Sequence, residues 1–419
     1  MRASMVRQQR AHSPQRWTAA HVRLADVHAG WRAAVEESVP QAKRWGDAGW
    51  RRHRLDETYH RLCAHPGAYL ASALELVVHA AGQDTAVLRQ WTEAFEQAAH
   101  DSADTVLLSW SGRFRDAIAD AEPAVVCLTA LLTHGRLGAG ARVWAHTYRG
   151  RHLYLAERDE EALTEFDQAL ATEPHNILAL VFRGETHRLL GQITQAVTDF
   201  TAALDIDPAD VRALGCRGEA HRDAGRYDQA VTDLTTALDI DPTNARFLAQ
   251  RGHAHRQAGR YDQAVTDLTT ALDIDPTSVW ALIARSHAHR QGGRYDQARE
   301  DLEWVLQAEP GNLGGMFERV ILDTATSGLG ACVEQWRQLL ASPVVVTVDA
   351  DLVGFFDLLQ VLVLEPEADA AEAAEVFLAG GQDPEVISDM LECLAELSAA
   401  GDRLADRARL CRQLIAERT

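Results

Sequence analysis

Apolar residues recur at helical spacing through most of the chain, interrupted by short polar segments that contain glycine or proline. In the tract AVTDLTTAL, the residues Ala230, Val231, Leu234, Ala237 and Leu238 fall on one face of a helix. Residues 14–142 and 313–419 show the same spacing, the second range in pairs near 314–341, 350–379 and 384–417. In residues 14–142 the breaks fall near Gly46, Pro66–Gly67, Gly82, Pro123 and Gly138. The pattern predicts an all-α protein.

The central part of this helical pattern repeats with a period of 34 residues, marked by Pro174, Pro208, Pro242, Pro276 and Pro310. The stretch AGRYDQAVTDLTTALDIDP occupies residues 224–242 and recurs letter for letter at 258–276. A fixed period of this size indicates stacked structural repeats. We interpret the verbatim copy as a duplicated structural part, not as duplicated chemistry.

Further columns recur in phase with the prolines. Small residues line up at Gly150, Gly184, Gly218, Gly252 and Ser286, and larger ones at Phe166, Phe200, Leu234, Leu268 and Leu302. These columns predict two antiparallel helices per period that approach closely at the small residues, with the large residue filling the space between them. A turn column holds Glu157, Gly191, Gly225, Gly259 and Gly293, where we expect positive φ after the first helix. The proline should then stop the second helix.

These columns resemble the tetratricopeptide repeat, which has Gly, Tyr, Ala, Phe/Leu, Ala and Pro at the same period. The resemblance implies a right-handed α-solenoid of five helix-turn-helix repeats with helical flanking regions. The repeats span residues 143–176, 177–210, 211–244, 245–278 and 279–312. An N-terminal helical region, 1–142, and a C-terminal one, 313–419, flank them and the latter could contain degenerate repeats. Residues 44–66 also resemble the helical region before such repeats in bacterial signalling ATPases of the STAND type, whose ATPase module this sequence lacks.

Composition narrows the function classes. The net charge is −20, with 11 Lys and Arg against 6 Asp and Glu in residues 1–60, and 7 against 19 in residues 311–419. We therefore expect no nucleic-acid partner. No apolar run predicts a membrane span, and no signal-peptide pattern opens the sequence, so we expect a cytoplasmic location. The six scattered cysteines indicate reduced thiols, without a zinc pattern.

Motifs for chemistry are sparse. Lys43 is the only lysine and does not follow a glycine, which excludes a P-loop and with it the usual nucleotide site. The sequence has no G-x-S-x-G or H-E-x-x-H motif. We expect no cofactor and no metal. A histidine column at His187, His221, His255 and His289 is interpreted as core packing, with a metal or pH-sensing role as the alternative.

Arginines form the most suggestive column, at Arg188, Arg222, Arg256 and Arg290. The resemblance places it on the concave groove, together with Trp144, Arg151, Arg212, Arg246, His253, Trp280 and His287. Arginine suits carboxylates and Trp suits interfaces, so this groove is our candidate site for an acidic or C-terminal peptide. The Lys/Asn carboxylate clamp of chaperone-tail binders is not matched, since Thr147 and Arg151 stand at its positions.

A plainer interpretation pairs Glu185 with Arg188 and Glu219 with Arg222 along one helix face, as solvated surface ion pairs. Arg256 and Arg290 have no acidic residue at that spacing. We predict a non-catalytic scaffold that holds a partner peptide or helix in the groove. One alternative is a regulatory arm that controls a separately encoded ATPase or transcription factor. Another is an enzyme with an unrecognised site in the flanking regions.

Overall fold

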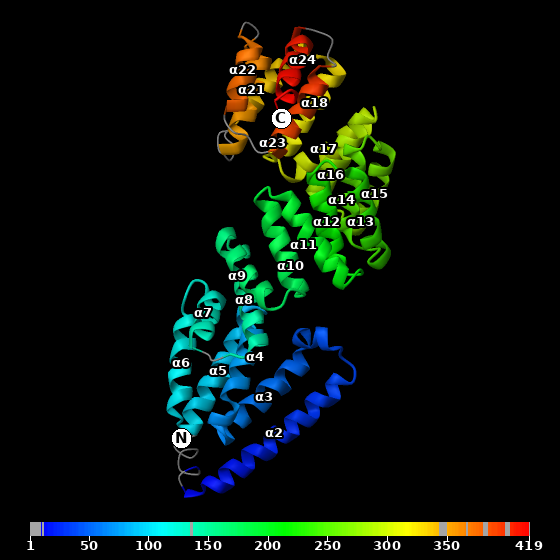
Figure 1. Cartoon of the computed structure of the whole chain (residues 1–419). Coiled ribbons are helices and arrows are strands. Elements are labelled where there is room, and N and C mark those ends of the chain that lie inside the picture. The colour runs from blue at the N-terminus through cyan, green and yellow to red at the C-terminus, as the bar shows by residue number, and fades with distance from the viewer. Residues whose placement is uncertain are drawn as a thin grey trace. The chain divides into compact units, whose positions relative to one another are not determined.

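The computed structural model describes residues 10, 12–134, 137–342, 350–365, 368–379, 384–398 and 403–418. These residues form helices joined by short turns, with no strand among them, which confirms the all-α prediction (Figure 1). The chain divides into two compact units, Met1–Pro208 and Ala209–Thr419. The division falls inside the repeats, between the second and the third, so each unit holds part of the repeat array. The predicted division into an N-terminal region, repeats and a C-terminal region stays a prediction.

The first unit begins with helices that precede the repeats. They are α2 (Pro14–Glu36), the 3-10 helix η1 (Gln41–Gly46), α3 (Ala48–Ala64), α4 (Pro66–Ala81), α5 (Thr85–Ser102), α6 (Thr105–Ile118) and α7 (Pro123–His134). Its repeats contribute α8 (Ala139–Leu155), α9 (Asp159–Thr172), α10 (Ile177–Leu189) and α11 (Ile193–Ile206). One core, which includes Leu62, Leu88, Phe114 and Leu128, joins α3 to α8. The first repeat is therefore packed directly against the N-terminal helices.

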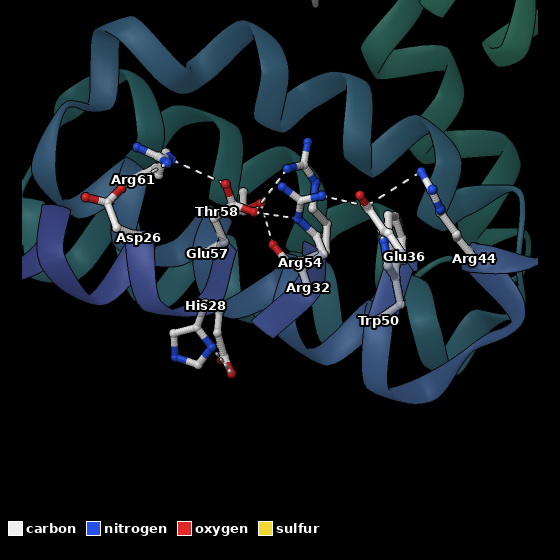
Figure 2. Close-up of polar contacts among 11 residues, drawn as sticks. Asp26, His28, Arg32, Glu36, Arg44, Trp50, Arg54, Glu57, Thr58 and Arg61 are labelled. Atoms are coloured by element: carbon white, nitrogen blue, oxygen red, sulfur yellow. Dashed lines mark hydrogen bonds and ion pairs between the residues drawn. The ribbon is translucent and has the colours of Figure 1, made fainter. Parts of the chain in front are cut away.

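Helices α2 and α3 form an antiparallel pair held by two carboxylates, of which Glu57 is buried and Glu36 is partly exposed (Figure 2). Glu57 on α3 is 6% exposed and accepts hydrogen bonds from Arg32, Arg54 and Arg61. Glu36 on α2 accepts a hydrogen bond from the indole of Trp50 at 2.8 Å. Burial alone would raise the pKa of Glu57, but the hydrogen bond from Arg32 and the charges of Arg54 and Arg32 outweigh it and lower the pKa. Glu57 is therefore charged at neutral pH.

The second unit begins with the remaining repeats, α12 (Val211–Asp223), α13 (Tyr227–Ile240), α14 (Ala245–Gln257), α15 (Tyr261–Ile274), α16 (Val279–Gln291) and α17 (Tyr295–Ala308). Each of these helices packs on the next. The chain continues through α18 (Leu313–Ser327), α19 (Leu329–Leu340), α21 (Ala350–Leu364), α22 (Ala370–Ala379), α23 (Pro384–Leu397) and α24 (Arg403–Ala416). The helical prediction for residues 313–419 is thus confirmed where the structure describes them.

These last helices share one core instead of stacking in order. Helix α24 packs on α21, α22 and α23, and α23 packs on α18 and α21. Trp336, Phe377, Met390 and Leu394 lie in the common core, with almost no exposed surface. In stacked repeats each unit contacts only its neighbours. The described part of residues 313–419 is therefore a small helical bundle at the end of the repeats.

The small and large columns meet inside each repeat, as predicted. A Cβ atom added to Gly184 would lie 2.7 Å from the ring of Phe200, and one on Gly218 would lie 2.9 Å from Leu234. These distances are too short for any side chain, so the glycines set the spacing of the two helices. In the fifth repeat the buried Ser286 replaces glycine and donates a hydrogen bond to the carbonyl oxygen of Ala298.

The predicted turn conformation is also confirmed. Gly191, Gly225, Gly259 and Gly293 have φ between 69° and 74°. Glu157 occupies the same position of the first repeat and has φ of 59°, which is uncommon for a residue with a side chain. The turn geometry therefore persists where the glycine is missing.

Two further columns were not recognised in the sequence. Two residues after each proline, a polar side chain caps the next helix by accepting from the backbone N–H three residues on; these caps are Asn176, Asp210, Asn244, Ser278 and Asn312. Within each repeat an arginine on the first helix also bonds an acidic residue 16 positions later; the pairs are Arg149–Glu165, Arg183–Asp199, Arg217–Asp233, Arg251–Asp267 and Arg285–Asp301.

The copied segment joins successive repeats. Arg260 donates to Nδ1 of His255 in its own repeat at 3.0 Å and also to Asp228 of the preceding repeat. Arg294 makes the equivalent contacts with His289 and Asp262. Burial lowers the pKa values of His255 and His289, which favours the neutral rings that accept these bonds. The identical sequence is thus accompanied by identical contacts at two interfaces between neighbouring repeats. Such an interface is here called a joint.

Candidate functional site

The predicted groove residues lie in three different surroundings. Trp144 and Arg151 belong to the first unit, on α8, where the face that carries them packs against α4. Arg151 donates to the carbonyl oxygen of Gly82 at 2.6 Å, and Trp144 is half-buried against the N-terminal core. Both side chains hold the first repeat to the preceding helices. The repeat columns carry no information about what covers this face of the helix.

The last predicted arginines are also engaged. Arg290 is only 5% exposed and donates from Nε to Oε1 of Glu318 at 2.6 Å and from Nη2 to Oε2 at 3.2 Å. Nε2 of His287 lies 4.0 Å from the same carboxylate. Arg290 has no acidic residue at the i,i+3 spacing, but helix α18, outside the repeat period, supplies it with an acidic partner. A two-bond ion pair of this kind holds the repeats to the C-terminal bundle.

Arg256 is buried beside this pair, at 4% exposure. Its Nη2 lies 3.0 Å from Nε2 of His253, and its Nη1 donates to Gln291. Burial lowers the pKa of His253 well below its ordinary value, and the charges of Arg256, Arg222 and His287 act in the same direction. His253 is therefore neutral and can accept a hydrogen bond from a guanidinium group. Arg256 and Arg290 do not form the exposed ladder that the sequence suggested.

An end pocket of about 390 Å³ adjoins these groups in the second unit. Ile283, Phe317, Phe355 and Phe356 give it apolar walls, and Arg256, His287, Arg290 and Glu318 line its polar side. Arg290 and Glu318 bond to each other across that side. The ion pair that joins the repeats to the bundle thus forms part of the pocket's lining.

The middle of the predicted groove is open. Arg222, Arg246 and Trp280 line a pocket of about 450 Å³, here called the groove pocket. The side chain of Arg246 is 66% exposed and that of Trp280 is exposed beside it. Gln250 and Asp275 complete the polar part of its rim. Guanidinium, amide and indole groups thus surround one hollow on the first-helix side of the third to fifth repeats.

The ion pairs in this region differ from the plain interpretation of the sequence. Glu219 accepts hydrogen bonds from Arg246 at 2.7 Å and from Gln250, both on α14 of the next repeat. Arg222 donates to Asp223 at 2.7 Å and lies 3.3 Å from Nδ1 of His253. Glu219 is therefore paired with the next repeat, and this contact positions Arg246 at the rim. The remaining predicted residues, Arg188 on α10 and the exposed Arg212 on α12, stay predictions.

Outside the predicted groove, metal sites, membrane-spanning helices and reactive cysteines are the other features that could indicate a function. Among the described residues, no group of three or more His, Cys, Asp and Glu side chains is arranged to hold a metal ion. In the same residues, no helix combines the length and the apolar character needed to cross a bilayer. Burial raises the pKa of the Cys127 thiol to about 12 and that of Cys411 to about 11, which makes both poor nucleophiles.

Comparisons with known proteins agree with the repeat geometry. Family models described as tetratricopeptide repeat match residues 149–211, 221–285 and 255–314. These segments are therefore tetratricopeptide repeats, of the all-α solenoid type. The models do not extend to the N-terminal helices, whose resemblance to STAND proteins stays a prediction. A comparison with curated proteins found no match.

Solved structures of related architecture were also found. A tetratricopeptide repeat protein from Parabacteroides merdae is 16% identical and matches 68% of this chain and 97% of its own, with a TM-score of 0.45. A thermophilic TPR protein from Thermus thermophilus is 25% identical over 44% of this chain and 98% of its own, with a TM-score of 0.36. YrrB, a TPR protein with an unusual peptide-binding site, is 16% identical over 46% and 97%, with a TM-score of 0.39. These low scores carry no argument about function.

Proposed function

We propose that this protein is a non-catalytic scaffold that binds a segment of a partner protein on the first-helix side of its third to fifth repeats. The observation that carries the proposal is the groove pocket, an open hollow of about 450 Å³ with Trp280 and Arg246 exposed at its rim. Exposed Trp and Arg side chains beside a pocket are the residue types that dominate binding energy at protein interfaces.

The proposed surface is narrower than the whole groove. Arg222, Arg246 and Trp280 belong to it, whereas Trp144 and Arg151 pack against α4 and Arg256 and Arg290 lie in buried contacts. The partner segment is proposed to be acidic, because Arg246 offers several N–H donors and its contact with Glu219 uses only part of them. The preformed ion pairs between repeats keep this surface rigid, which lowers the entropy lost on binding.

The test compares two variants of the full chain in affinity capture from extract of the source cells, with the retained proteins identified by mass spectrometry. Trp280→Ala combined with Arg246→Glu should lose the proteins that the unchanged chain retains. Trp304→Ala is the matched control, because Trp304 is exposed to a similar degree (42% against 48% for Trp280) but lies on the second helix of the fifth repeat. Equal capture by all three proteins would contradict the proposed surface.

A further inference from the structure

The groove pocket coincides with an unusual set of small residues in the repeat columns. The column of Ala245 otherwise contains Val143, Ile177, Val211, Val279 and Leu313. The column of Ala249 otherwise contains Thr147, Val181, Gly215 and Ile283. Ala245 and Ala249 both line the groove pocket. Side chains that are larger in most other repeats are thus reduced to methyl groups at this place.

At the joint between the third and fourth repeats, the protein fills the corresponding space with its own side chain. Phe247 of the fourth repeat packs over Gly215 of the third so closely that a Cβ atom on Gly215 would lie 2.3 Å from its ring. One repeat later, the same two positions are Ala281 and Ala249. Both of these alanines line the groove pocket. A phenylalanine ring therefore fills the joint between the third and fourth repeats, while two methyl groups face the pocket between the fourth and fifth.

The following joint also carries a large apolar side chain, Ile283, which lines the end pocket. A Cβ atom added to Gly314 would lie 3.4 Å from Cδ1 of Ile283, so this isoleucine lies close to the next helix. Ile283 takes the place that Ala249 has one repeat earlier. The joints on both sides thus carry a large apolar side chain from this protein itself, and the joint between them has an open pocket.

We infer that the groove pocket receives one large apolar side chain, of leucine or phenylalanine size, from the partner segment, and that an acidic residue beside it in that segment pairs with Arg246. This inference rests on the proposed function and adds the chemistry of the partner. The methyl groups of Ala245, Ala249 and Ala281 and the indole of Trp280 form an apolar lining. An apolar side chain that enters this lining leaves water, which favours binding through the hydrophobic effect.

The charges at the rim favour an acidic residue next to the apolar anchor of the partner segment. Arg246 is anchored to Glu219 by its Nη2 atom and still exposes most of its side chain. Asp275 is the acidic residue on the rim, against the two cations Arg222 and Arg246. A carboxylate next to the anchor residue is therefore attracted to the rim, whereas a lysine or arginine there meets two guanidinium groups. The ring of Trp280 rests 5.8 Å from that of His253, which supports it beside the opening.

The experiment selects peptides from a random display library against the full chain and measures the affinity of the enriched peptides by fluorescence anisotropy. We expect them to share one Leu, Phe, Met or Ile next to Asp or Glu. The decisive variant is Ala249→Gly with Ala281→Phe, which copies the Gly215/Phe247 pair into the open joint. It should bind these peptides at least about tenfold more weakly, since its own phenylalanine takes the place of the anchor.

A second variant tests the pocket with a substitution that should not disturb folding. Ala245→Val installs the residue that Val211 and Val279 provide in neighbouring repeats, so it should fold normally and weaken the peptides about threefold to tenfold. Circular dichroism should show unchanged helicity and melting for both variants. Size-exclusion chromatography with light scattering tests whether a second copy of this chain occupies the pocket: a dimer that the double variant abolishes would overturn the partner assignment.

The remaining outcomes separate the inference from the proposed function. Enriched peptides that bind the double variant as well as the unchanged chain, but lose binding with Trp280→Ala and Arg246→Glu, would overturn the pocket and keep the proposed surface. Peptides insensitive to all of these substitutions, or no enrichment at all, would overturn both. Enriched peptides that lack an apolar residue would overturn the assigned partner chemistry.

Discussion

Nδ1 of His21 and Nδ1 of His60 lie 2.9 Å apart between helices α2 and α3. Two imidazole nitrogens can share a hydrogen bond only if one carries a proton and the other does not. The rings of Trp17 and Tyr59 pack around the pair, and the ring of His28 lies 5.7 Å from that of His60 in a tilted arrangement. Burial, with the nearby charges of His21 and His28, lowers the pKa of His60 to about 4. Burial also lowers the pKa of His21.

Acid should therefore loosen the α2–α3 pair. The pKa of His60 is about 4 in the folded chain and near 6.5 when unfolded, so the unfolded chain binds more protons below pH 6.5. The stability of this contact is full above pH 6.5 and falls as the pH drops towards 4. The nearby acids, Asp56 and Asp101, oppose the shift without reversing it. Hydrogen exchange of residues 14–64 should be faster at pH 5 than at pH 7.5, after correction for the intrinsic rate.

The control for this prediction is the variant His21→Phe with His60→Phe, which removes both titrating rings and keeps aromatic packing. Its corrected exchange in α2 and α3 should depend much less on pH in this window. Glu57 and Glu36 also have lowered pKa values, so they remain charged throughout the window and do not contribute. Equal protection of the unchanged chain at both pH values would refute the role of the histidine pair.

Removing the charge of Glu57 should destabilise the first unit. Three arginines, Arg32, Arg54 and Arg61, direct their side chains at this buried carboxylate (Figure 2). Glu57→Gln keeps the shape but leaves the arginines repelling one another, at an expected loss of about 2 kcal/mol in the free energy of unfolding. Glu96→Gln is the matched control, because Glu96 and its partner Arg115 are much more exposed; it should change stability by less than about 1 kcal/mol. Urea unfolding of both variants measures the difference.

The repeat fold was predictable because glycine and proline act locally. Gly225 needs no tertiary information to indicate a positive φ, and Pro242 stops a helix wherever it stands. The caps Asn244 and Ser278 could have been found from the same columns, since a short polar residue two positions after the proline is a helix-start signal. Local chemistry therefore accounts for most of the boundaries within the repeats.

The candidate site was less predictable, because whether another helix covers a groove residue depends on the tertiary structure. Arg290 meets Glu318 from a helix outside the 34-residue period, and Arg151 meets the backbone of Gly82, 69 residues earlier. Neither contact can be recognised from the residues in the repeat columns. The groove pocket can be recognised there, since Ala245 and Ala249 replace larger residues of most other repeats, and a comparison of volumes down each column would have revealed it.

Glu157→Gly should stabilise the protein. Glu157 has φ of 59° at the turn where the other four repeats have glycine. A left-handed conformation costs a residue with a side chain about 1 kcal/mol relative to glycine. The variant should therefore gain about that much free energy of unfolding, reduced slightly by the greater freedom of the unfolded chain. Ala156→Gly tests the specificity, since Ala156 has φ of −98° and should lose stability instead.

Gly184→Ala should destabilise the second repeat, because the new methyl group would lie 2.7 Å from the ring of Phe200. Overpacking of this kind costs about 1–3 kcal/mol, more than the helix propensity that alanine adds. The chain itself indicates a compensating pair: the fifth repeat has Ser286 and Leu302 at these positions, and Ser286 is fully buried there. Gly184→Ser with Phe200→Leu should therefore be more stable than Gly184→Ser alone. Thermal melting of the single and double variants decides this, and a double variant that melts no higher than the single one would show that the glycine column does not set the helix spacing.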